Sequence, residues 1–204
     1  MNWLLNNYIE VLGTVTGLIY LYLEIKQNIW LWPLGIATSA FYIFVFFKAK
    51  FYADMGLQVY YLLISIYGWW HWLYGGESKK KDDLPITNTT TKVWVQLSIA
   101  SLALFGIMAV VLKNLTDSPV PIGDAFVTAL SITATWMLAR KLIEQWWIWV
   151  VVNLMSLGLF IWKELYPTSV LFFFYFTMAV VGYYEWKKEM LKVKTQVTIG
   201  TEMN

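Results

Sequence analysis

Cysteine is absent from this chain, and His71 is the only histidine. Without cysteine there can be no disulfide framework, no thiolate metal site and no cysteine nucleophile. His71 stands between Trp70 and Trp72, a setting that favours anchoring at an apolar–polar interface over proton transfer. The chain also has no Walker loop, Rossmann fingerprint or nucleophile elbow. We therefore predict no metal, no cofactor and no enzymatic activity.

Charge is scarce as well. Only 14% of the 204 residues are charged, whereas 59% are hydrophobic. The apolar residues come in runs of about 20, the length that crosses a hydrocarbon layer as a helix. Backbone amides in lipid must bond within their own segment, so these runs are predicted to be helices. We expect an all-α integral membrane protein with seven transmembrane helices, at 8–26, 29–48, 53–75, 91–112, 120–141, 145–163 and 167–186.

The basic residues are distributed unevenly between the two sides of this predicted membrane. Eleven of them, including Arg140 and Lys187, fall on the side of the C-terminus. Only Lys48, Lys50, Lys113 and Lys163 fall on the other side. Because basic residues concentrate on the cytoplasmic side, we expect the N-terminus outside and the C-terminus in the cytoplasm. Lys79–Lys81 is then a determinant of topology in a solvated loop, and no nucleic-acid partner is expected.

An internal repeat organises the sequence. At a fixed offset of 114, Trp32, Tyr52, Tyr61, Gly68 and Trp72 recur as Trp146, Tyr166, Tyr175, Gly182 and Trp186. We expect one membrane domain, 1–204, with three-helix repeats at 8–75 and 120–187, a linker helix at 91–112 and a cytoplasmic tail at 188–204. A shift of three residues is also possible around the second helix, so the register there is open. Parallel repeats of this kind are a known transporter plan, with the substrate site between the halves.

The predicted third helix has a polar and aromatic stripe. Asp54, Gln58, Tyr61, Ser65, Trp69 and Trp72 follow one another at spacings of three or four residues, which places them on one helical face. Uncompensated polar groups in hydrocarbon cost several kcal/mol each, so this face should meet protein or water. It either bonds neighbouring helices or lines a substrate path. We favour the path, because so many large amphipathic side chains share the face.

Other helices add candidate contacts. Thr38 and Tyr42 are one turn apart in the second helix, Asn153 and Ser156 lie deep in the sixth, and Tyr175 lies within the seventh. Asp124, Thr128, Ser131 and Thr135 share a face of the fifth helix, where packing and ligand contact are equally open. Aromatic rings with hydroxyls and amides suit a small flat polar solute, not a metal ion or a phosphorylated nucleotide. The candidate binding residues are Thr38, Tyr42, Gln58, Tyr61, Ser65, Trp69, Trp72, Asn153 and Tyr175.

Three stretches carry a family resemblance. The segments WPLGIATSAFYIFVFFKAKFYADMGLQVYYLLISIYGWWHW, RKLIEQWWIWVVVNLMS and VVGYYEW closely resemble PnuC-type vitamin transporters. The resemblance implies a three-plus-one-plus-three helix fold, similar in plan to the sugar-transporting SWEETs, and assembly as a homotrimer in a bacterial inner membrane. It also implies facilitated-diffusion uptake of nicotinamide riboside, which a cytosolic kinase traps by phosphorylation. Carried over position by position, the family's contacts fall on Gln58, Trp69, Trp72 and Asn153.

The chain departs from the family pattern at two positions. The resemblance leads us to expect asparagines where this chain has Thr38 and Ser65, so smaller hydroxyls replace two amides. Relatives within the family carry thiamine, which is therefore the alternative substrate. A membrane sensor or assembly protein without transport is the alternative from another class, and it predicts that the polar stripe holds helices together.

Overall fold

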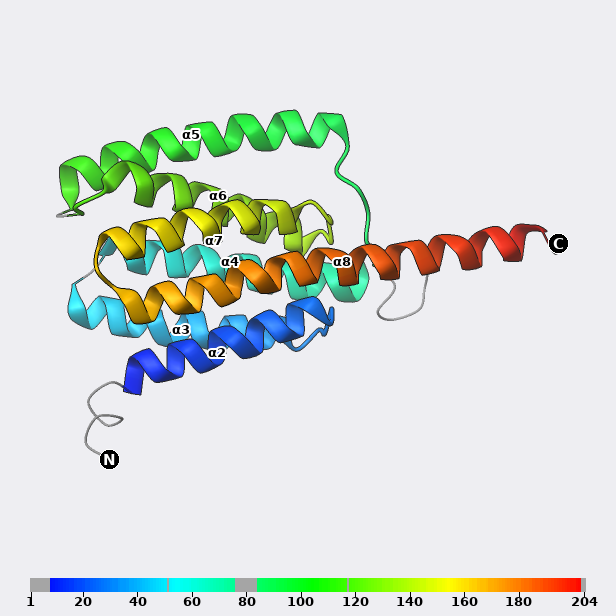
Figure 1. Cartoon of the computed structure of the whole chain (residues 1–204), viewed down its shortest axis with the longest axis horizontal. Helices are drawn as coiled ribbons and strands as arrows, with labels where there is room; N and C mark the ends of the chain where they lie inside the picture. The colour runs from blue at the N-terminus through cyan, green and yellow to red at the C-terminus, as the bar shows by residue number, and fades with distance from the viewer. Residues whose placement is uncertain (1–7, 51, 76–83, 117, 203–204) are drawn as a thin grey trace. The chain divides into compact units, whose positions relative to one another are not determined.

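The computed structural model describes residues 8–50, 52–75, 84–116 and 118–202, so Lys79–Lys81 lie outside the described residues. In these ranges the chain forms seven helices, as expected for an all-α protein. Four of the described helices, α3, α5, α6 and α7, are long and apolar enough to cross a membrane by length and composition alone. The helices are α2 (Tyr8–Ile25), α3 (Leu31–Ala49), α4 (Tyr52–Tyr74), α5 (Thr91–Leu115), α6 (Pro121–Ala139), α7 (Gln145–Trp162) and α8 (Tyr166–Glu202) (Figure 1).

The chain divides into a first unit, Met1–Leu84, and a second unit, Pro85–Asn204. In the first unit α3 packs on both α2 and α4. Trp32, in the first turn of α3, is fully buried, and its ring meets Trp72 of α4 edge to face with centroids 5.4 Å apart. Gly68 lies directly against the Trp32 ring, since a Cβ at this position would stand 2.4 Å from the ring. A glycine is therefore required where α4 crosses this tryptophan.

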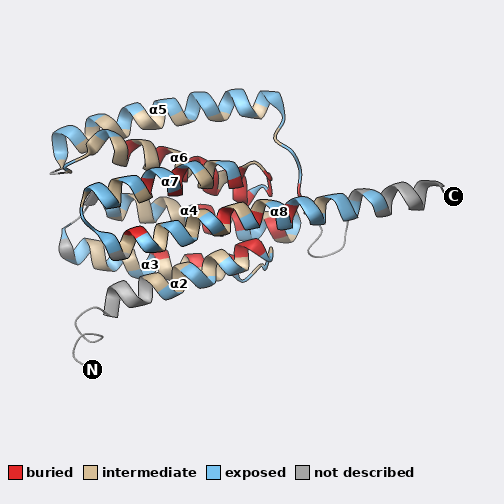
Figure 2. Ribbon diagram, in the orientation of Figure 1, coloured by how far each residue is buried: buried red, intermediate tan, exposed pale blue. Residues whose placement is uncertain are grey.

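The second unit repeats this packing on its own residues. Trp146, in the first turn of α7, is fully buried and meets Trp186 of α8 edge to face at 5.6 Å. A Cβ on Gly182 would again lie 2.4 Å from the tryptophan ring. The burial is visible as red ribbon near these helix ends (Figure 2). We call each set of three residues, Trp32–Gly68–Trp72 and Trp146–Gly182–Trp186, a tryptophan clasp.

The turns of the two units also match. The four described non-glycine residues with positive φ form two pairs 114 positions apart, Gln27 (51°) with Lys141 (51°) and Lys50 (62°) with Glu164 (59°). The amide of Asn28 donates to the Leu23 carbonyl at 2.8 Å, and its counterpart Leu142 donates to Met137 at 3.0 Å. α3 and α7 themselves begin 114 residues apart. The local geometry therefore follows the offset of 114 in the region where the sequence left the register open.

α5 packs on α6 within the second unit. The hydroxyls of Ser101 and Thr133 are 2.6 Å apart, and Phe105 meets Phe126 edge to face at 6.2 Å. None of the described residues of α5 is buried (Figure 2), and large apolar side chains such as Leu102 cover its outer face. A helix that is apolar all round yet exposed in an isolated chain is suited to contact lipid.

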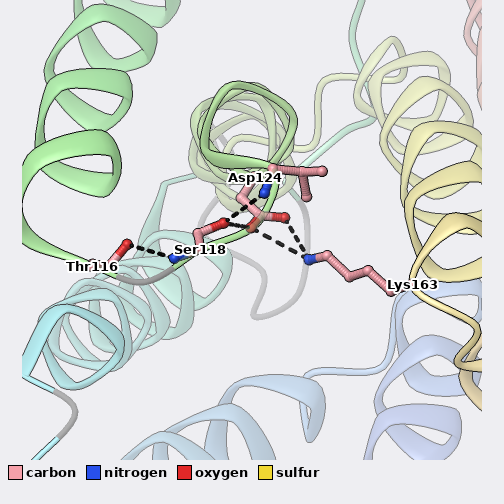
Figure 3. A network of polar contacts seen from close by, with 5 residues as sticks. Thr116, Ser118, Asp124 and Lys163 are labelled. Carbon is pink, nitrogen blue, oxygen red and sulfur yellow. Dashed lines mark hydrogen bonds and ion pairs between the residues drawn. The ribbon is translucent and has the colours of Figure 1, made fainter.

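Polar contacts fix both ends of α5 to the rest of the second unit. Before α5, Thr87 pairs by backbone hydrogen bonds with Lys141 and Ile143 in the α6–α7 turn, and Glu144 accepts two hydrogen bonds from Thr89. After α5, Asp124 accepts a hydrogen bond of 2.6 Å from the Ser118 hydroxyl and binds the Lys163 ammonium at 3.1 Å (Figure 3). The second contact joins the start of α6 to the end of α7.

Candidate functional site

The stripe predicted on α4 shows three levels of burial. Asp54 and Trp69 are exposed and Gln58 is half-buried, as is Tyr61. Ser65 and Trp72 are buried, at 4% and 3% exposure. Trp72 belongs to the first tryptophan clasp, so its ring already has a packing role within the unit. We therefore expect the binding face of α4 to lie around Gln58, Tyr61 and Ser65.

The close approach of α3 and α4 occurs at Ser65. A Cβ on Gly35 of α3 would lie 2.8 Å from the Ser65 hydroxyl oxygen and 3.3 Å from the Tyr20 ring of α2. All three helices of the first unit thus converge at this level. Any residue larger than glycine at position 35 would push Ser65 or Tyr20 aside.

The inner face of α3 runs through Gly35, Ser39 and Tyr42. Ser39 is buried, at 4% exposure, and Tyr42 is half-buried. The Tyr42 ring stacks on Phe46 at 5.8 Å and meets Phe41 edge to face at 5.5 Å. Thr38 is also half-buried, next to this face. These residues present hydroxyls beside aromatic rings, which is the chemistry that the sequence predicts for the site.

The inner face of α7 has polar side chains within an otherwise apolar helix. Asn153 and Ser156 are buried, at 6% and 3% exposure, and Trp149 lies one turn before Asn153. The indole nitrogen of Trp149 is buried and has no hydrogen-bond partner among the residues that the structure describes. Neither Asn153 nor Ser156 forms a side-chain hydrogen bond with any described residue. We call Trp149, Asn153 and Ser156 the α7 polar stripe.

Hydroxyls elsewhere in the same unit are satisfied locally. The described Ser131, Thr133, Thr135 and Ser169 each donate to the carbonyl four residues earlier, at 2.8 to 3.0 Å. This internal bonding gives Ser131 and Thr135, which were open candidates, a structural role. The α7 polar stripe differs, because the buried indole nitrogen of Trp149 has no hydrogen-bond partner among the described residues. Such a group costs about 1–3 kcal/mol unless water or a ligand meets it. The contrast separates candidate ligand contacts from packing hydroxyls.

The offset of 114 relates the inner faces of α3 and α7 residue by residue. Ser39 corresponds to Asn153, and Tyr42 corresponds to Ser156. Both members of the first pair are buried. Sequence reasoning therefore missed Ser39, and the repeat was the signal that could have found it once Asn153 was a candidate. Ser156 was noted beside Asn153 but was not included among the candidate contacts, and Trp149 was not a candidate.

The described residues hold no group of three or more His, Asp or Glu side chains placed to bind a metal ion. The site residues of both units are instead hydroxyls, amides and aromatic rings on membrane-length helices. Such side chains on long apolar helices are typical of multi-pass α-helical membrane proteins, the class to which carriers of small organic solutes belong.

Comparison with known proteins makes the class specific. A family model described as nicotinamide mononucleotide transporter matches residues 7–188, and the chain belongs to this family. The nicotinamide riboside transporter PnuC of Escherichia coli is 24% identical over 88% of this chain and 85% of its own length. The riboflavin/roseoflavin transporter RibM of Streptomyces davaonensis is 26% identical over 74% of this chain and 70% of its own length.

A solved structure shares the fold. The crystal structure of the vitamin B3 transporter PnuC superposes with a TM-score of 0.69 and 23% identity, covering 91% of this chain and 83% of that chain. At this level of identity the likeness concerns the fold alone. The resemblance stated from the sequence is confirmed at the level of the family.

Proposed function

We propose that this protein is a carrier for nicotinamide riboside, taken up by facilitated diffusion across a bacterial inner membrane and trapped by a cytosolic kinase that phosphorylates it. The relatives named as nicotinamide riboside transporters span most of the chain and support this substrate. The observation in the molecule that supports it best is the α7 polar stripe, where Asn153 and Ser156 are buried and the buried indole nitrogen of Trp149 has no hydrogen-bond partner among the described residues.

The chemistry of the candidate contacts favours a riboside over its phosphate ester. Gln58, Ser65 and Asn153 would hold hydroxyls or ring substituents, while Tyr61 and Tyr175 would stack on a flat cationic ring. Thr38, Tyr42, Trp69 and Trp72 complete the proposed set, to which we add Ser39, Trp149 and Ser156. No lysine or arginine belongs to this set, so a phosphate would have no charge partner among these residues.

The proposal also covers the arrangement of the repeats, the assembly and the orientation in the membrane. We propose two parallel three-helix repeats, 8–75 and 120–187, with residues 91–112 as the linker helix, and transport of the solute by alternating access. The paired clasps and paired positive-φ turns support the duplication. A homotrimer, with the N-terminus outside and the C-terminus in the cytoplasm, is the assembly and orientation that we propose.

A different flat vitamin is the second candidate. RibM, named as a riboflavin/roseoflavin transporter, is similar to this chain at 26% identity, so members of this group carry ring systems other than nicotinamide. Thiamine remains in consideration because Thr38 and Ser65 stand where amides are expected in riboside carriers. Compared with amides, hydroxyls at these two contacts leave more space and offer fewer hydrogen-bond donors. Both differences change which solute the site selects.

Uptake into proteoliposomes by purified protein tests the proposal. Labelled nicotinamide riboside, its mononucleotide, thiamine and riboflavin are supplied in parallel. We expect uptake of the riboside, and a loss of about tenfold with Asn153→Leu, because one hydrogen bond to the solute is removed. Leu154→Ala, at an exposed position on the same helix, is the matched control and should transport normally. Uptake of none of the four solutes would refute the carrier proposal. Normal uptake with impaired oligomerisation in Asn153→Leu would make the α7 polar stripe a helix-packing feature.

A further inference from the structure

α8 is much longer than the helix that it packs against. α8 covers Tyr166–Glu202, whereas its antiparallel partner α7 covers Gln145–Trp162. The second tryptophan clasp places Trp186 against the first turn of α7. The 16 residues from 187 to 202 therefore continue beyond the end of α7 (Figure 1). Within the second unit, α7 is the only described helix that α8 contacts.

With α8 as the seventh crossing of the proposed topology, its length places this extension at the membrane surface. From Tyr166 to Trp186 the helix rises about 31 Å, the thickness of the hydrocarbon layer. The headgroup region adds about 5–8 Å on each side of that layer. Residues 187–192 rise about 9 Å, so this part of α8 passes through the headgroups. The first turns of the extension are therefore at the depth of lipid phosphates.

The side chains of these turns combine basic and apolar groups. Lys187, Lys188 and Lys192 are exposed, and Glu189 is the one acidic residue among residues 187–192. Leu191 and Val193 are 52% and 45% exposed. A helix surrounded by water would be polar on all faces. Exposed aliphatic side chains between lysines are instead typical of a helix in contact with an anionic lipid surface.

The two ion contacts in the segment leave positive charge unneutralised. Lys192 pairs with Glu189 at 3.1 Å, but both side chains are about half exposed, so the pair is weak and easily exchanged. Lys187 lies over the Tyr183 ring at 5.6 Å, which holds its aliphatic stem along the helix. Lys188 has no acidic partner among the described residues. Three lysines and one glutamate leave two net positive charges.

We propose that the extension of α8 beyond Trp186 is a docking surface for the headgroups of anionic phospholipids. The lysines bind the phosphates, while Leu191 and Val193 lie toward the outer side of the headgroup region. Each net charge near an anionic surface is worth about a fivefold shift in the contact equilibrium. Two net charges then raise the equilibrium constant for contact with an anionic surface about thirtyfold above its value for a neutral surface. This inference concerns a surface outside the proposed substrate contacts and does not depend on them.

The absence of native cysteine allows a direct test on the full chain. A fluorescent probe is attached to Leu191→Cys, and its quenching by an aqueous quencher is measured in nanodiscs of phosphatidylcholine, with or without added phosphatidylglycerol. We expect clearly stronger protection with phosphatidylglycerol than in phosphatidylcholine alone, and this added protection should be lost at high salt. The variant Lys187→Gln/Lys188→Gln/Lys192→Gln should lose this protection. The matched variant Lys48→Gln/Lys50→Gln/Lys113→Gln, which removes three charges elsewhere, should keep it.

Four results would overturn the proposal. Equal quenching in both lipids, or protection that survives the three substitutions near Leu191, removes the electrostatic lipid contact. Protection reversed by soluble glycerol phosphate would assign a binding site for free phosphate instead of a lipid surface. Protection in phosphatidylcholine that rises with protein concentration would assign the surface to a second copy of the chain. The salt titration on the chain with intact lysines keeps the test valid if the triple variant folds poorly.

Discussion

The tryptophan clasps show how single residues determine the packing of these helices. In each clasp a tryptophan ring lies against a glycine of the following helix. A second tryptophan stands one helical turn after that glycine. The contact therefore depends on shape complementarity and not on hydrogen bonds. The indole nitrogens of Trp32 and Trp146 are both buried, and neither has a hydrogen-bond partner in the described part of the chain. That cost is incurred twice at equivalent positions, which indicates that close contact between the helices outweighs it.

Gly68→Ala and Gly182→Ala should each destabilise the protein. The added Cβ would lie 2.4 Å from the tryptophan ring, and such overpacking costs about 1–3 kcal/mol. Thermal unfolding of detergent-purified protein should show midpoints lower by several degrees. Gly106→Ala is the matched control, because nothing lies within 4 Å of its Cβ position, and it should be neutral or slightly stabilising. Gly68→Ala should cost less when combined with Trp32→Phe, and equal costs in the two backgrounds would contradict the clasp.

At the scale of helices, the residues at a close contact of the first unit differ from their counterparts in the second unit. The first unit has Tyr20, Gly35 and Ser65 in contact. Their counterparts at the offset of 114 are Ala134, Trp149 and Ala179. The bulky residue therefore comes from the first helix in one unit and from the middle helix in the other.

Much of this element structure could be predicted from the sequence, because apolar runs of membrane length have few alternatives to helix. The equivalence of Trp32, Gly68 and Trp72 with their counterparts was also visible at the offset of 114. What could not be predicted is which hydroxyls are satisfied. Ser131 and Ser156 look alike in sequence, but only Ser131 donates to its own helix backbone among described residues. That difference depends on rotamers set by neighbouring helices.

The ion pair that joins α6 to α7 should contribute modestly to stability. Asp124 and Lys163 have side-chain exposures of 30% and 20%, so water screens the pair in part. Asp124→Asn leaves Lys163 without its acidic partner and should cost about 1 kcal/mol. Adding Lys163→Met should recover part of this loss in thermal unfolding. Glu189→Gln, which breaks the more exposed pair with Lys192, is the control and should have no measurable effect. No loss with Asp124→Asn would show that the network of Figure 3 is not stabilising.

At the scale of the whole molecule, the proposed carrier mechanism depends on the number of helices that cross the membrane. Four described helices qualify as membrane spans by length and composition, while the charge distribution and the repeat predict seven. α4 is the informative case. Its 23 residues rise about 35 Å, enough to cross the hydrocarbon layer, but polar residues such as Gln58 and Ser65 make it less apolar. A carrier needs such a helix, since polar side chains must reach the solute within the membrane.

The cysteine-free sequence makes the seven-crossing topology testable with single cysteines. Lys50→Cys and Lys113→Cys should react with a membrane-impermeant maleimide in intact cells, because both positions are predicted to lie outside. Thr90→Cys and Lys192→Cys should react only after permeabilisation. Lys50 and Thr90 flank α4 along the chain, so opposite accessibility at these two positions means that the chain crosses the membrane between them. Equal accessibility would mean that α4 does not cross, and the two repeats could not then run in the same direction.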